Sequence, residues 1–513
     1  MNTPAPRSWS QAAAVYLDRR AVTMLLLGFS AGMPILLIFS SLSLWLREAG
    51  VERSTVTMFS WAALAYSFKF IWAPLIDALP VPLLSRLLGR RRGWLLVAQV
   101  LIICGMVAMS MVDPQAPGQL AYMAAAAVLL GFSSATQDVV IDAYRIELAP
   151  EDAAMQAVMS STYLAGYRIA MVVAGAGALY LAEGLGSTKE HYVYAAWQTT
   201  YLIMAAVMFV GVATTVCVRE PAVGQRRELS VPANEYLRLV LVFVLSVAVF
   251  VAVFAAAARV MFKDLDPLLG FLQEAVRLAL ALSGAGLTGW LLVKLGAVSK
   301  ETAYRTWVEP VVDFFTRYGR SALWVLALIG LYRISDVVAG VISNVFYEDL
   351  GFTKIQIANA VKTVGVLMVI VGGFLGGLLA QRMSLVKLLA LGAVLASLTN
   401  FLFVLLAWRG NDALFLYLAV MIDNLAVGIA GSAFIAFMSA LTNIRFTAVQ
   451  FAIFSSLMTL LPKTLGGYSG AMVDNIGYPA FFTFTALIGL PVLWLVYQVG
   501  KRMDSLGKPP TAE

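Results

Sequence analysis

The sequence predicts an all-α protein that lies within a lipid bilayer, and three observations lead to this fold class. Hydrophobic residues make up 61% of the 513 residues and charged residues 13%, whereas soluble proteins have about 45–50% and about 25%. The mean hydropathy is +0.84. The apolar runs are also unbroken, unlike the alternating pattern of barrel strands, so they predict membrane-spanning helices.

A helix needs about 20 residues to cross the hydrocarbon core of a bilayer. Fourteen runs meet this length: 21–46, 54–76, 94–112, 119–142, 153–182, 194–218, 236–261, 270–293, 321–346, 355–380, 384–407, 413–440, 446–472 and 479–500. The pair Arg19–Arg20 precedes a run that is too long for a cleaved signal core, so 21–46 is assigned as the first span. The run at 270–293 is the weakest, because Glu274 and Arg277 interrupt its first turns.

The basic residues of the connecting loops fix the expected orientation. With the N-terminus inside, most Lys and Arg residues fall in inside loops, for example in the stretch 86–92. Both termini are therefore expected in the cytoplasm. Without the weak span at 270–293, every later loop would lie on the opposite side of the membrane, and the excess of Lys and Arg in inside loops would be smaller. Fourteen spans are therefore retained. The formal net charge of +7 thus reflects loop placement and gives no indication of nucleic-acid binding.

Two segments far apart in the chain share a pattern that indicates an internal repeat. In 153–182, Ser160–Ser161 precede Arg168, and in 446–472, Ser455–Ser456 precede Lys463 at the same spacing. The count then reads as 6+2+6 helices, with two parallel six-helix halves typical of the major facilitator fold. The expected divisions are an N-terminal half (1–220), an inserted two-helix hairpin and cytoplasmic linker (221–320), a C-terminal half (321–503) and a disordered tail (504–513).

The insertion is expected to lie at the periphery, outside the transport pathway, because it carries few buried charges. Glu274 and Arg277 are separated by three residues and can pair with each other. The linker 294–320 is charged, and an amphipathic stretch near Trp307–Phe315 is expected at the cytoplasmic surface.

Ionisable residues inside the spans are functional candidates, because each costs about 2.5–3.5 kcal/mol on insertion scales. Their depths follow from the rise of 1.5 Å per helical residue. Asp138 and Asp142 are expected in the cytoplasmic third of the membrane, and Lys362 nearer the outside. The others are expected near mid-membrane: Lys69, Arg168, Arg333, Asp336, Asp423 and Lys463. Because lipid-facing charges would be too costly on so many helices, these residues are expected to line one central water-filled cavity.

The carboxylates are the candidates for proton coupling. Asp138, Asp142 and Arg145 lie at i, i+4 and i+7 on one helix face, so Asp142 can form a structural pair with Arg145. Asp138 is one turn deeper and is the better proton carrier, since a carboxyl group in a poorly hydrated cavity can bind and release a proton near neutral pH. Its alternative role is as a fixed partner of Lys69 or Arg168.

In the C-terminal half, Asp423 has no basic neighbour within one helical turn. It is either a second proton site or a partner of Lys463 or Lys362 on another helix. Arg333 and Asp336 are separated by three residues, so a local pair is expected as an alternative to substrate binding.

Basic residues slightly outnumber carboxylates within the spans, which favours an anionic substrate. Arg168 is the main candidate for binding a carboxylate, because a guanidinium group can donate two parallel hydrogen bonds. The remaining candidates for substrate binding are Lys69, Arg333, Asp336, Lys362 and Lys463, with the amides Gln137 and Asn424 and the aromatic residues Tyr66 and Tyr167. For the aromatic residues, ordinary helix packing is the alternative.

A gate on the cytoplasmic side is expected where Asp77 meets the basic cluster Arg90, Arg91 and Arg92. Pairs between these groups would break and re-form as the two halves move.

Several strings, spread in order over both halves, resemble those of the AmpG-type muropeptide permeases. They are GFSAGMP (28–34), FKFIWAPLID (68–77), GRRRGWLL (89–96), QDVVIDAYRIE (137–147), GYRIAM (166–171), LYRISD (331–336), GGLLAQR (376–382), DNL (423–425) and TAVQFA (447–452). The resemblance covers the chain except for about 222–318. It implies a multi-pass protein of the bacterial inner membrane that imports N-acetylglucosaminyl-anhydromuramyl peptides with protons for peptidoglycan recycling, with a link to β-lactamase induction.

Other functions remain as alternatives. The same fold would suit an importer of another anionic metabolite, such as acetyl-CoA, or a drug antiporter, since a fold does not determine a substrate. An enzyme is disfavoured, because the two cysteines, Cys104 and Cys217, and the single histidine, His191, offer no metal cluster. We therefore expect no metal and no cofactor beyond the proton motive force. The expected partners are the substrate, protons and lipid, with the protein as a monomer.

Overall fold

The computed structural model describes residues 9–52, 55–56, 59, 66, 68–188, 190–222, 233–260, 267–466 and 468–506, and every regular element in them is helical. The first group of helices, from α2 to α13, is called the N-terminal bundle below. With the two short elements that precede it, its elements are α1 (Trp9–Ala14), η1 (Val15–Leu17), α2 (Arg19–Leu36), η2 (Leu37–Ser41), α3 (Leu42–Glu48), η4 (Lys69–Ile71), α6 (Ala73–Ala78), α7 (Leu84–Leu88), α8 (Arg90–Ser110), α9 (Gln119–Leu148), α10 (Ala153–Val172), η5 (Val173–Gly177), α11 (Ala178–Gly184), α12 (Tyr194–Val207) and α13 (Phe209–Cys217).

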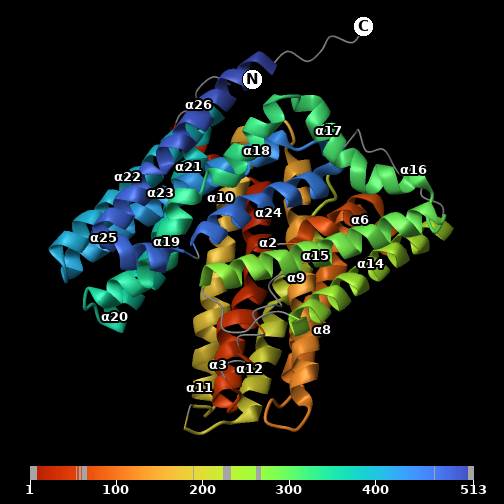
Figure 1. The fold of residues 1–513 in the computed structure, drawn as a ribbon, viewed down its shortest axis with the longest axis horizontal. Helices are drawn as coiled ribbons and strands as arrows, with labels where there is room; N and C mark the ends of the chain where they lie inside the picture. Colours follow the sequence, from red (N-terminus) through yellow and green to blue (C-terminus); the bar gives the residue numbers. More distant parts are fainter. Residues whose placement is uncertain are drawn as a thin grey trace.

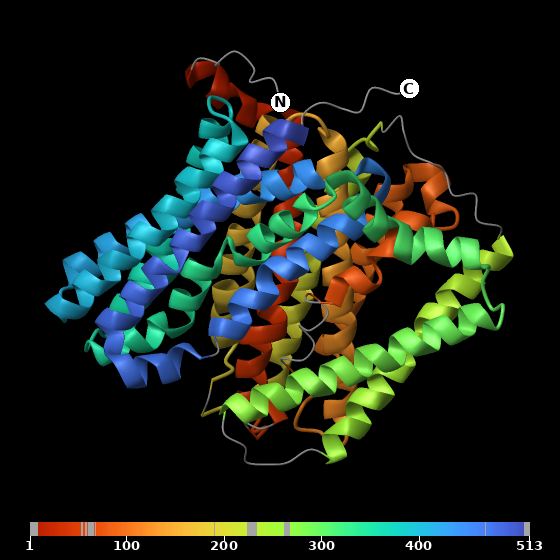
Figure 2. The ribbon, with the colours of Figure 1, turned by 45° about the horizontal axis from the view of Figure 1, so that its top comes forward.

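The middle of the chain forms a helical hairpin and a linker. Their elements are α14 (Ala233–Val260), α15 (Pro267–Lys294), α16 (Lys300–Ala303), η6 (Tyr304–Val308) and α17 (Glu309–Tyr318). The hairpin helices α14 and α15 lie side by side and cross the N-terminal bundle obliquely (Figures 1 and 2). Tyr236 ties α14 to that bundle by donating a hydrogen bond to the carbonyl of Pro80 at 2.7 Å.

The last group of helices, from α18 to α26, is called the C-terminal bundle. Its elements are α18 (Ser321–Leu331), α19 (Ile334–Asp349), α20 (Lys354–Ile357), η7 (Ala358–Gly365), α21 (Val366–Ala380), α22 (Leu385–Arg409), α23 (Ala413–Leu441), η8 (Ile444–Phe446), α24 (Thr447–Gly466), α25 (Ser469–Leu487) and α26 (Gly489–Leu506). The tail expected from residue 504 begins within α26, and residues 507–513 lie outside the described part.

Over the described residues, twelve helices are long and apolar enough to cross a membrane. They correspond to twelve of the fourteen expected spans, including both helices of the hairpin. Most of the span expected at 54–76 lies outside the described residues. The span expected at 446–472 corresponds to η8 and α24, whose apolar segment, Ile444–Thr459, is shorter than the other spans. The count of fourteen stays a prediction.

Two expected spans differ from the helices of the structure. The 54–76 run is not one helix at its end, because η4 stops at Ile71 and α6 starts anew with Pro74 in its first turn, where a missing N–H costs nothing. In the C-terminal bundle, α24 already ends at Gly466, and α25 begins at Ser469, within the span expected at 446–472. A second break, at Gly477 inside α25, falls in the loop expected between 472 and 479; its φ of 76° is a conformation that favours glycine.

The amphipathic stretch of the linker is helical, as expected. On α17, Pro310 and Phe314 are buried, and Val311, Val312 and Phe315 are exposed. Arg317 at the end of α17 donates hydrogen bonds to the carbonyl of Leu441 and to Gln450 of the C-terminal bundle. The linker is therefore attached to the C-terminal bundle.

The two bundles meet near one end of the molecule and diverge towards the other (Figures 1 and 2). The end at which they meet carries α1 and the last turns of α26, and it is called the terminal end below. The N-terminal bundle has two apolar cores and the C-terminal bundle a third. Within the N-terminal bundle, α2 and α10 pack backbone to backbone, because a Cβ atom at Gly166 would lie 1.9 Å from the Leu25 carbonyl oxygen.

Candidate functional site

The intramembrane charges form one cluster in each bundle. In the N-terminal bundle, the Lys69 ammonium lies 3.7 Å from the Asp142 carboxylate, which lies 3.3 Å from the Arg145 guanidinium. Asp138 accepts a hydrogen bond from the Tyr163 hydroxyl at 3.3 Å. Lys69 is 7% exposed and Asp138 9% exposed, so both are held away from bulk water. The spacing along α9 brings these groups to one helix face, as expected, and Lys69 pairs with Asp142 instead of Asp138.

Aromatic hydroxyls surround Asp138. Tyr66, Tyr163 and Tyr167 all interact electrostatically with its carboxylate. The Tyr66 hydroxyl donates to Ser134 at 2.7 Å, and the Tyr163 and Tyr167 rings lie 6.0 Å apart. Ring faces and hydroxyls therefore form one wall beside this carboxylate.

Gln137 lies on a different face of α9. Its side-chain oxygen accepts a hydrogen bond from Ser30 on α2 at 2.9 Å, and the residue is fully buried. This contact ties two helices of one bundle together. A role for Gln137 in substrate binding stays a prediction.

In the C-terminal bundle, Arg333 and Asp336 form the local pair that their spacing predicts. The guanidinium donates two hydrogen bonds to one carboxylate oxygen, at 3.0 and 2.6 Å. Asp423 accepts a hydrogen bond from the Thr399 hydroxyl at 2.8 Å. The neighbouring Asn424 amide donates to the carbonyl of Val420 on its own helix. Asp423 thus has a neutral hydroxyl partner, as Asp138 does.

Arg168 interacts unfavourably with the positive charge of Arg333, which belongs to the other bundle. The Arg168 Nε atom is buried and has no hydrogen-bond partner among the described residues. Two cations thus influence each other across the region between the bundles. Lys362 lies on η7 and is exposed. Lys463 lies on α24, but its side chain is outside the described part of the structure.

A buried ion cluster joins the bundles at the terminal end, and its centre is Arg91. The Arg91 guanidinium lies 2.6 Å from Asp77 and 2.6 Å from Glu147, and it is fully buried. It also donates to the Thr447 hydroxyl of the other bundle at 2.6 Å. Thr447 in turn donates to Glu147 at 2.8 Å. This set of contacts is called the Arg91 latch below.

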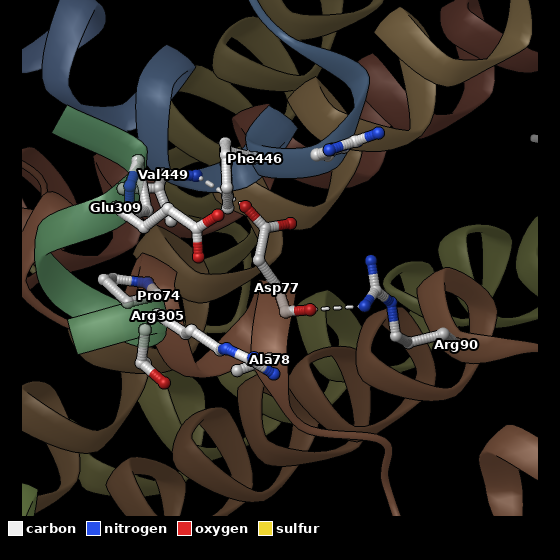
Figure 3. Close-up of a pocket in the computed structure, with 11 residues that line it drawn as sticks. Pro74, Asp77, Ala78, Arg90, Arg305, Glu309, Phe446 and Val449 are labelled. Atoms are coloured by element: carbon white, nitrogen blue, oxygen red, sulfur yellow. Dashed lines mark hydrogen bonds between the residues drawn. The ribbon is translucent and has the colours of Figure 1, made fainter. Parts of the chain in front are cut away.

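Asp77 extends the latch to the start of α24. Its second carboxylate oxygen accepts a hydrogen bond from the backbone N–H of Val449 at 2.9 Å, and Figure 3 shows the side chain pointing at this turn. The first N–H groups of a helix have no partner within the helix and carry partial positive charge. The carboxylate therefore stabilises the helix start of the opposite bundle.

The three basic residues expected in the gate have different partners. Arg90 donates to the backbone carbonyl of Asp77 (Figure 3). Arg92 donates to the carbonyls of Thr215 and Val216, at the end of α13. Successive residues of a helix point about 100° apart, and the three side chains therefore leave α8 in different directions. Among these three, Arg91 alone has a described side-chain hydrogen bond to the C-terminal bundle.

A pocket lies beside the latch, where the N-terminal bundle, the linker and the C-terminal bundle meet. It is lined by Pro74, Asp77, Ala78, Arg90, Arg305, Thr306, Glu309, Pro310, Arg445, Phe446 and Val449 (Figure 3).

Several residues of this junction were not predicted from the sequence. Arg145 was expected to pair with Asp142, but it also donates to Ser439 of the C-terminal bundle at 2.8 Å and lies 5.1 Å from the Phe451 ring. Glu147 was left without a role, although an acidic residue at the end of a span is a signal that could have been used. Thr447 gives no such signal, because a threonine at a helix start is common.

In the hairpin, Arg277 is 4% exposed, and its guanidinium lies 3.7 Å from the Phe254 ring. The side chain of Glu274, the expected partner of Arg277, lies outside the described part of the structure.

Comparisons with known proteins agree with this architecture. Residues 21–331 match the Major Facilitator Superfamily. The chain is 30% identical over 490 residues to the anhydromuropeptide permease of Escherichia coli, covering 95% of this chain and 81% of that protein. It is 29% identical over 490 residues to the Rickettsia conorii protein called AmpG 4, covering 96% of this chain and 99% of that protein.

Solved structures show the same fold at low sequence identity. The outward conformation of FucP matches with a TM-score of 0.59 and 13% identity, over 94% of this chain and 99% of that one. The proton:xylose symporter XylE, bound to 6-bromo-6-deoxy-D-glucose, matches with a TM-score of 0.57 and 12% identity, over 95% and 96%.

Replacing Arg91 by Gln should lower the free energy of unfolding by about 3–5 kcal/mol, because Asp77 and Glu147 would keep buried charges without their cation. Denaturant unfolding of the purified protein in mixed micelles measures this loss. Adding Glu147→Gln to Arg91→Gln should recover part of it. Arg409→Gln is the control, since the Arg409 side chain is 59% exposed and a surface pair contributes about 0–1 kcal/mol. An Arg91→Gln loss as small as that of the control would contradict the latch.

Proposed function

The chain belongs to the AmpG-type permeases of the major facilitator superfamily, and from this membership we propose that it imports anhydromuropeptides together with protons across the bacterial inner membrane. It is a multi-pass membrane transporter and not an enzyme. The E. coli relative is named for the anhydromuropeptide substrate. The proposal extends that substrate to this chain and adds proton coupling.

The observation that carries the substrate assignment is that the buried Nε atom of Arg168 has no hydrogen-bond partner among the described residues. Arg333, which belongs to the opposite bundle, is close enough for its positive charge to repel that of Arg168. An anion bound between the two guanidinium groups would convert this repulsion into two attractive contacts. The stem peptide of a muropeptide ends in carboxylates, so it supplies such an anion. Asp336 already neutralises Arg333 in part, which leaves Arg168 as the stronger site for the substrate carboxylate.

The sugar part of the substrate needs aromatic faces and hydrogen-bond donors. Tyr66 and Tyr167 supply both beside Asp138. The remaining candidates, Lys69, Gln137, Lys362, Asn424 and Lys463, are proposed as secondary contacts. Of these, Lys69 already has an anionic partner, Asp142.

For the proton, we propose Asp138 first and Asp423 second. Each of them accepts a hydrogen bond from a neutral hydroxyl, Tyr163 or Thr399. Asp142 instead lies between two cations, Lys69 and Arg145. A proton at Asp142 would disrupt its ion pairs with Lys69 and Arg145, whereas a proton at Asp138 or Asp423 would leave the described ion pairs intact. Asp142 is therefore the third candidate.

The transport cycle is proposed to be a rocking of residues 1–220 against 321–503, with the termini in the cytoplasm and fourteen spans. The described contacts between the bundles at the terminal end then form a closed cytoplasmic gate, in which Asp77 and Arg91 bridge to the C-terminal bundle and Arg90 and Arg92 support them. The hairpin and linker, within 221–320, are proposed to lie outside the pathway, and the protein is proposed to act as a monomer.

Uptake into proteoliposomes with an imposed pH gradient tests the function. Labelled anhydromuropeptide should accumulate when the outside is acidic, and a proton uncoupler should abolish accumulation. Unlabelled acetyl-CoA and a cationic drug serve as competitors. Accumulation of labelled acetyl-CoA that excess anhydromuropeptide leaves unchanged would favour the other anionic metabolite, and proton-driven efflux of the drug would favour an antiporter.

Asp138→Asn should abolish proton-driven accumulation, because the amide has nearly the same shape as the carboxyl group but cannot carry a proton. Exchange of labelled for unlabelled substrate at equal pH is expected to continue. Glu301→Gln is a suitable control, since the Glu301 side chain is 71% exposed in the linker. Accumulation at the parental level in Asp138→Asn would transfer the proton role to Asp423.

Arg168→Lys should weaken substrate affinity about ten- to a hundredfold, although it keeps the charge. The ammonium group cannot make the two parallel hydrogen bonds of a guanidinium, and a hydrogen bond to a charged group contributes about 1.5–3 kcal/mol. Binding to the purified protein by calorimetry gives the affinity without a transport assay. Arg409→Lys at the surface is expected to bind as the parent does. An unchanged affinity in Arg168→Lys would mean that Arg168 is a structural residue.

A further inference from the structure

Helix α21 carries two pairs of adjacent glycines, and the two members of each pair face different bundles. The pairs are Gly372–Gly373 and Gly376–Gly377. Residues four apart lie on the same side of a helix, so Gly372 and Gly376 form one stripe and Gly373 and Gly377 form another.

The first stripe packs inside the C-terminal bundle. A Cβ atom at Gly372 would lie 2.1 Å from the Leu425 carbonyl oxygen, and one at Gly376 would lie 2.1 Å from the Ser432 hydroxyl. Both partners belong to α23. Because this contact joins two helices of one bundle, rocking of the two bundles would not need to separate it.

The second stripe faces the N-terminal bundle and the segment before it. A Cβ atom at Gly373 would lie 3.6 Å from that of Ser161 on α10. A Cβ atom at Gly377 would lie 2.1 Å from the hydroxyl of Tyr16, which comes from η1. The absence of side chains at Gly373 and Gly377 therefore leaves a socket on α21, and Tyr16 occupies it.

Tyr16 fills this socket with specific contacts. Its hydroxyl donates a hydrogen bond to the backbone carbonyl of Phe374 at 2.7 Å, and its ring lies 4.8 Å from the Phe374 ring. The Ser161 hydroxyl lies 3.2 Å from the same phenolic oxygen. Burial raises the pKa of Tyr16 to about 12, so the phenol keeps its donor proton throughout the physiological range.

The chain directly after Tyr16 is fixed to the N-terminal bundle. Asp18 accepts a hydrogen bond from the backbone N–H of Arg20 and caps α2. The Arg20 guanidinium lies 2.9 Å from the same carboxylate. Tyr16 therefore extends from the start of α2 to α21, and its contacts connect the two bundles.

The Tyr16 contact and the Arg91 latch close different seams. The latch joins α6, α8 and α9 to α24. Tyr16 and Ser161 join η1 and α10 to α21. Opening of the terminal end by rocking requires both seams to separate.

We propose that Tyr16 is a positioning residue of the transport cycle, which closes the α10–α21 seam at the terminal end by inserting into the glycine socket of α21. The inference rests on the proposed rocking of the two bundles, but it does not depend on the substrate or on the coupling ion. Loss of the Tyr16 contact favours the state in which the terminal end is open.

The test is the distance between two spin labels, at Arg86 in the N-terminal bundle and at Lys387 in the C-terminal bundle, both exposed. The two exposed cysteines, Cys104 and Cys217, are first replaced by Ala. Without substrate and at constant pH, Tyr16→Phe should increase the ratio of long to short distances about two- to tenfold, because one hydrogen bond between the bundles is lost. Gly377→Ala should act in the same direction, because its methyl group occupies the position of the Tyr16 hydroxyl.

Tyr201→Phe is the matched control. Tyr201 also donates a hydrogen bond to a helix carbonyl, that of Leu37 at 2.8 Å, but both residues lie within the N-terminal bundle. It should lower thermal stability without changing the distance ratio. Unchanged ratios in both Tyr16→Phe and Gly377→Ala would overturn the proposal, as would an equal change in Tyr201→Phe. Because the measurement uses no substrate, an error in the proposed substrate or in proton coupling leaves its result unaffected.

Discussion

The cost of placing a charge in a medium that cannot hydrate it governs the arrangement of the polar residues in this protein. An isolated ion in a low-dielectric environment costs several kcal/mol, so it is kept only where a counter-charge and hydrogen bonds offset the loss of water. Arg91 meets this condition with two carboxylates and is fully buried. Arg333, which directly precedes α19, meets it with Asp336 in the first turn of that helix. This compensation is incomplete at Arg168, whose buried Nε atom has no hydrogen-bond partner among the described residues, and for this reason Arg168 is proposed as the site that binds an anion.

The same constraint distinguishes the carboxylates. In the N-terminal bundle Asp142 lies beside two cations, and in the C-terminal bundle Asp336 lies beside Arg333. Asp138 and Asp423 face neutral hydroxyls. The two bundles thus have similar pairs of acids, in which one carboxylate has a cationic partner and the other does not. This division within each bundle supports a cycle in which protonation changes the charge of the site without disrupting the ion pairs that maintain the fold.

Local spacing made part of this arrangement predictable from the sequence. The face shared by Asp138 and Asp142, and the pair of Arg333 with Asp336, follow from helical periodicity, and unbroken apolar runs predicted most of the helices. The partners of Arg91 could not be predicted, because Thr447 lies 356 positions away and hydrophobic periodicity carries no information about contacts between distant helices. The ends of the runs were also unreliable. The break at Gly477 falls in the loop expected between the runs 446–472 and 479–500, but α24 ends at Gly466, inside the first of these runs.

The Arg91 latch is asymmetric in one respect: its charges all belong to the N-terminal bundle. The C-terminal bundle contributes a hydroxyl from Thr447 and a backbone N–H from Val449. If the bundles separated there, Arg91 would keep its ion pairs with Asp77 and Glu147. The C-terminal bundle would be left with no unpaired charge of the latch. The junction thus resembles a contact between a preassembled ionic unit and a neutral surface. Its strength should depend little on ionic strength, and an exchange of Thr447 for serine should be tolerated in evolution far better than the loss of any one charge of the cluster.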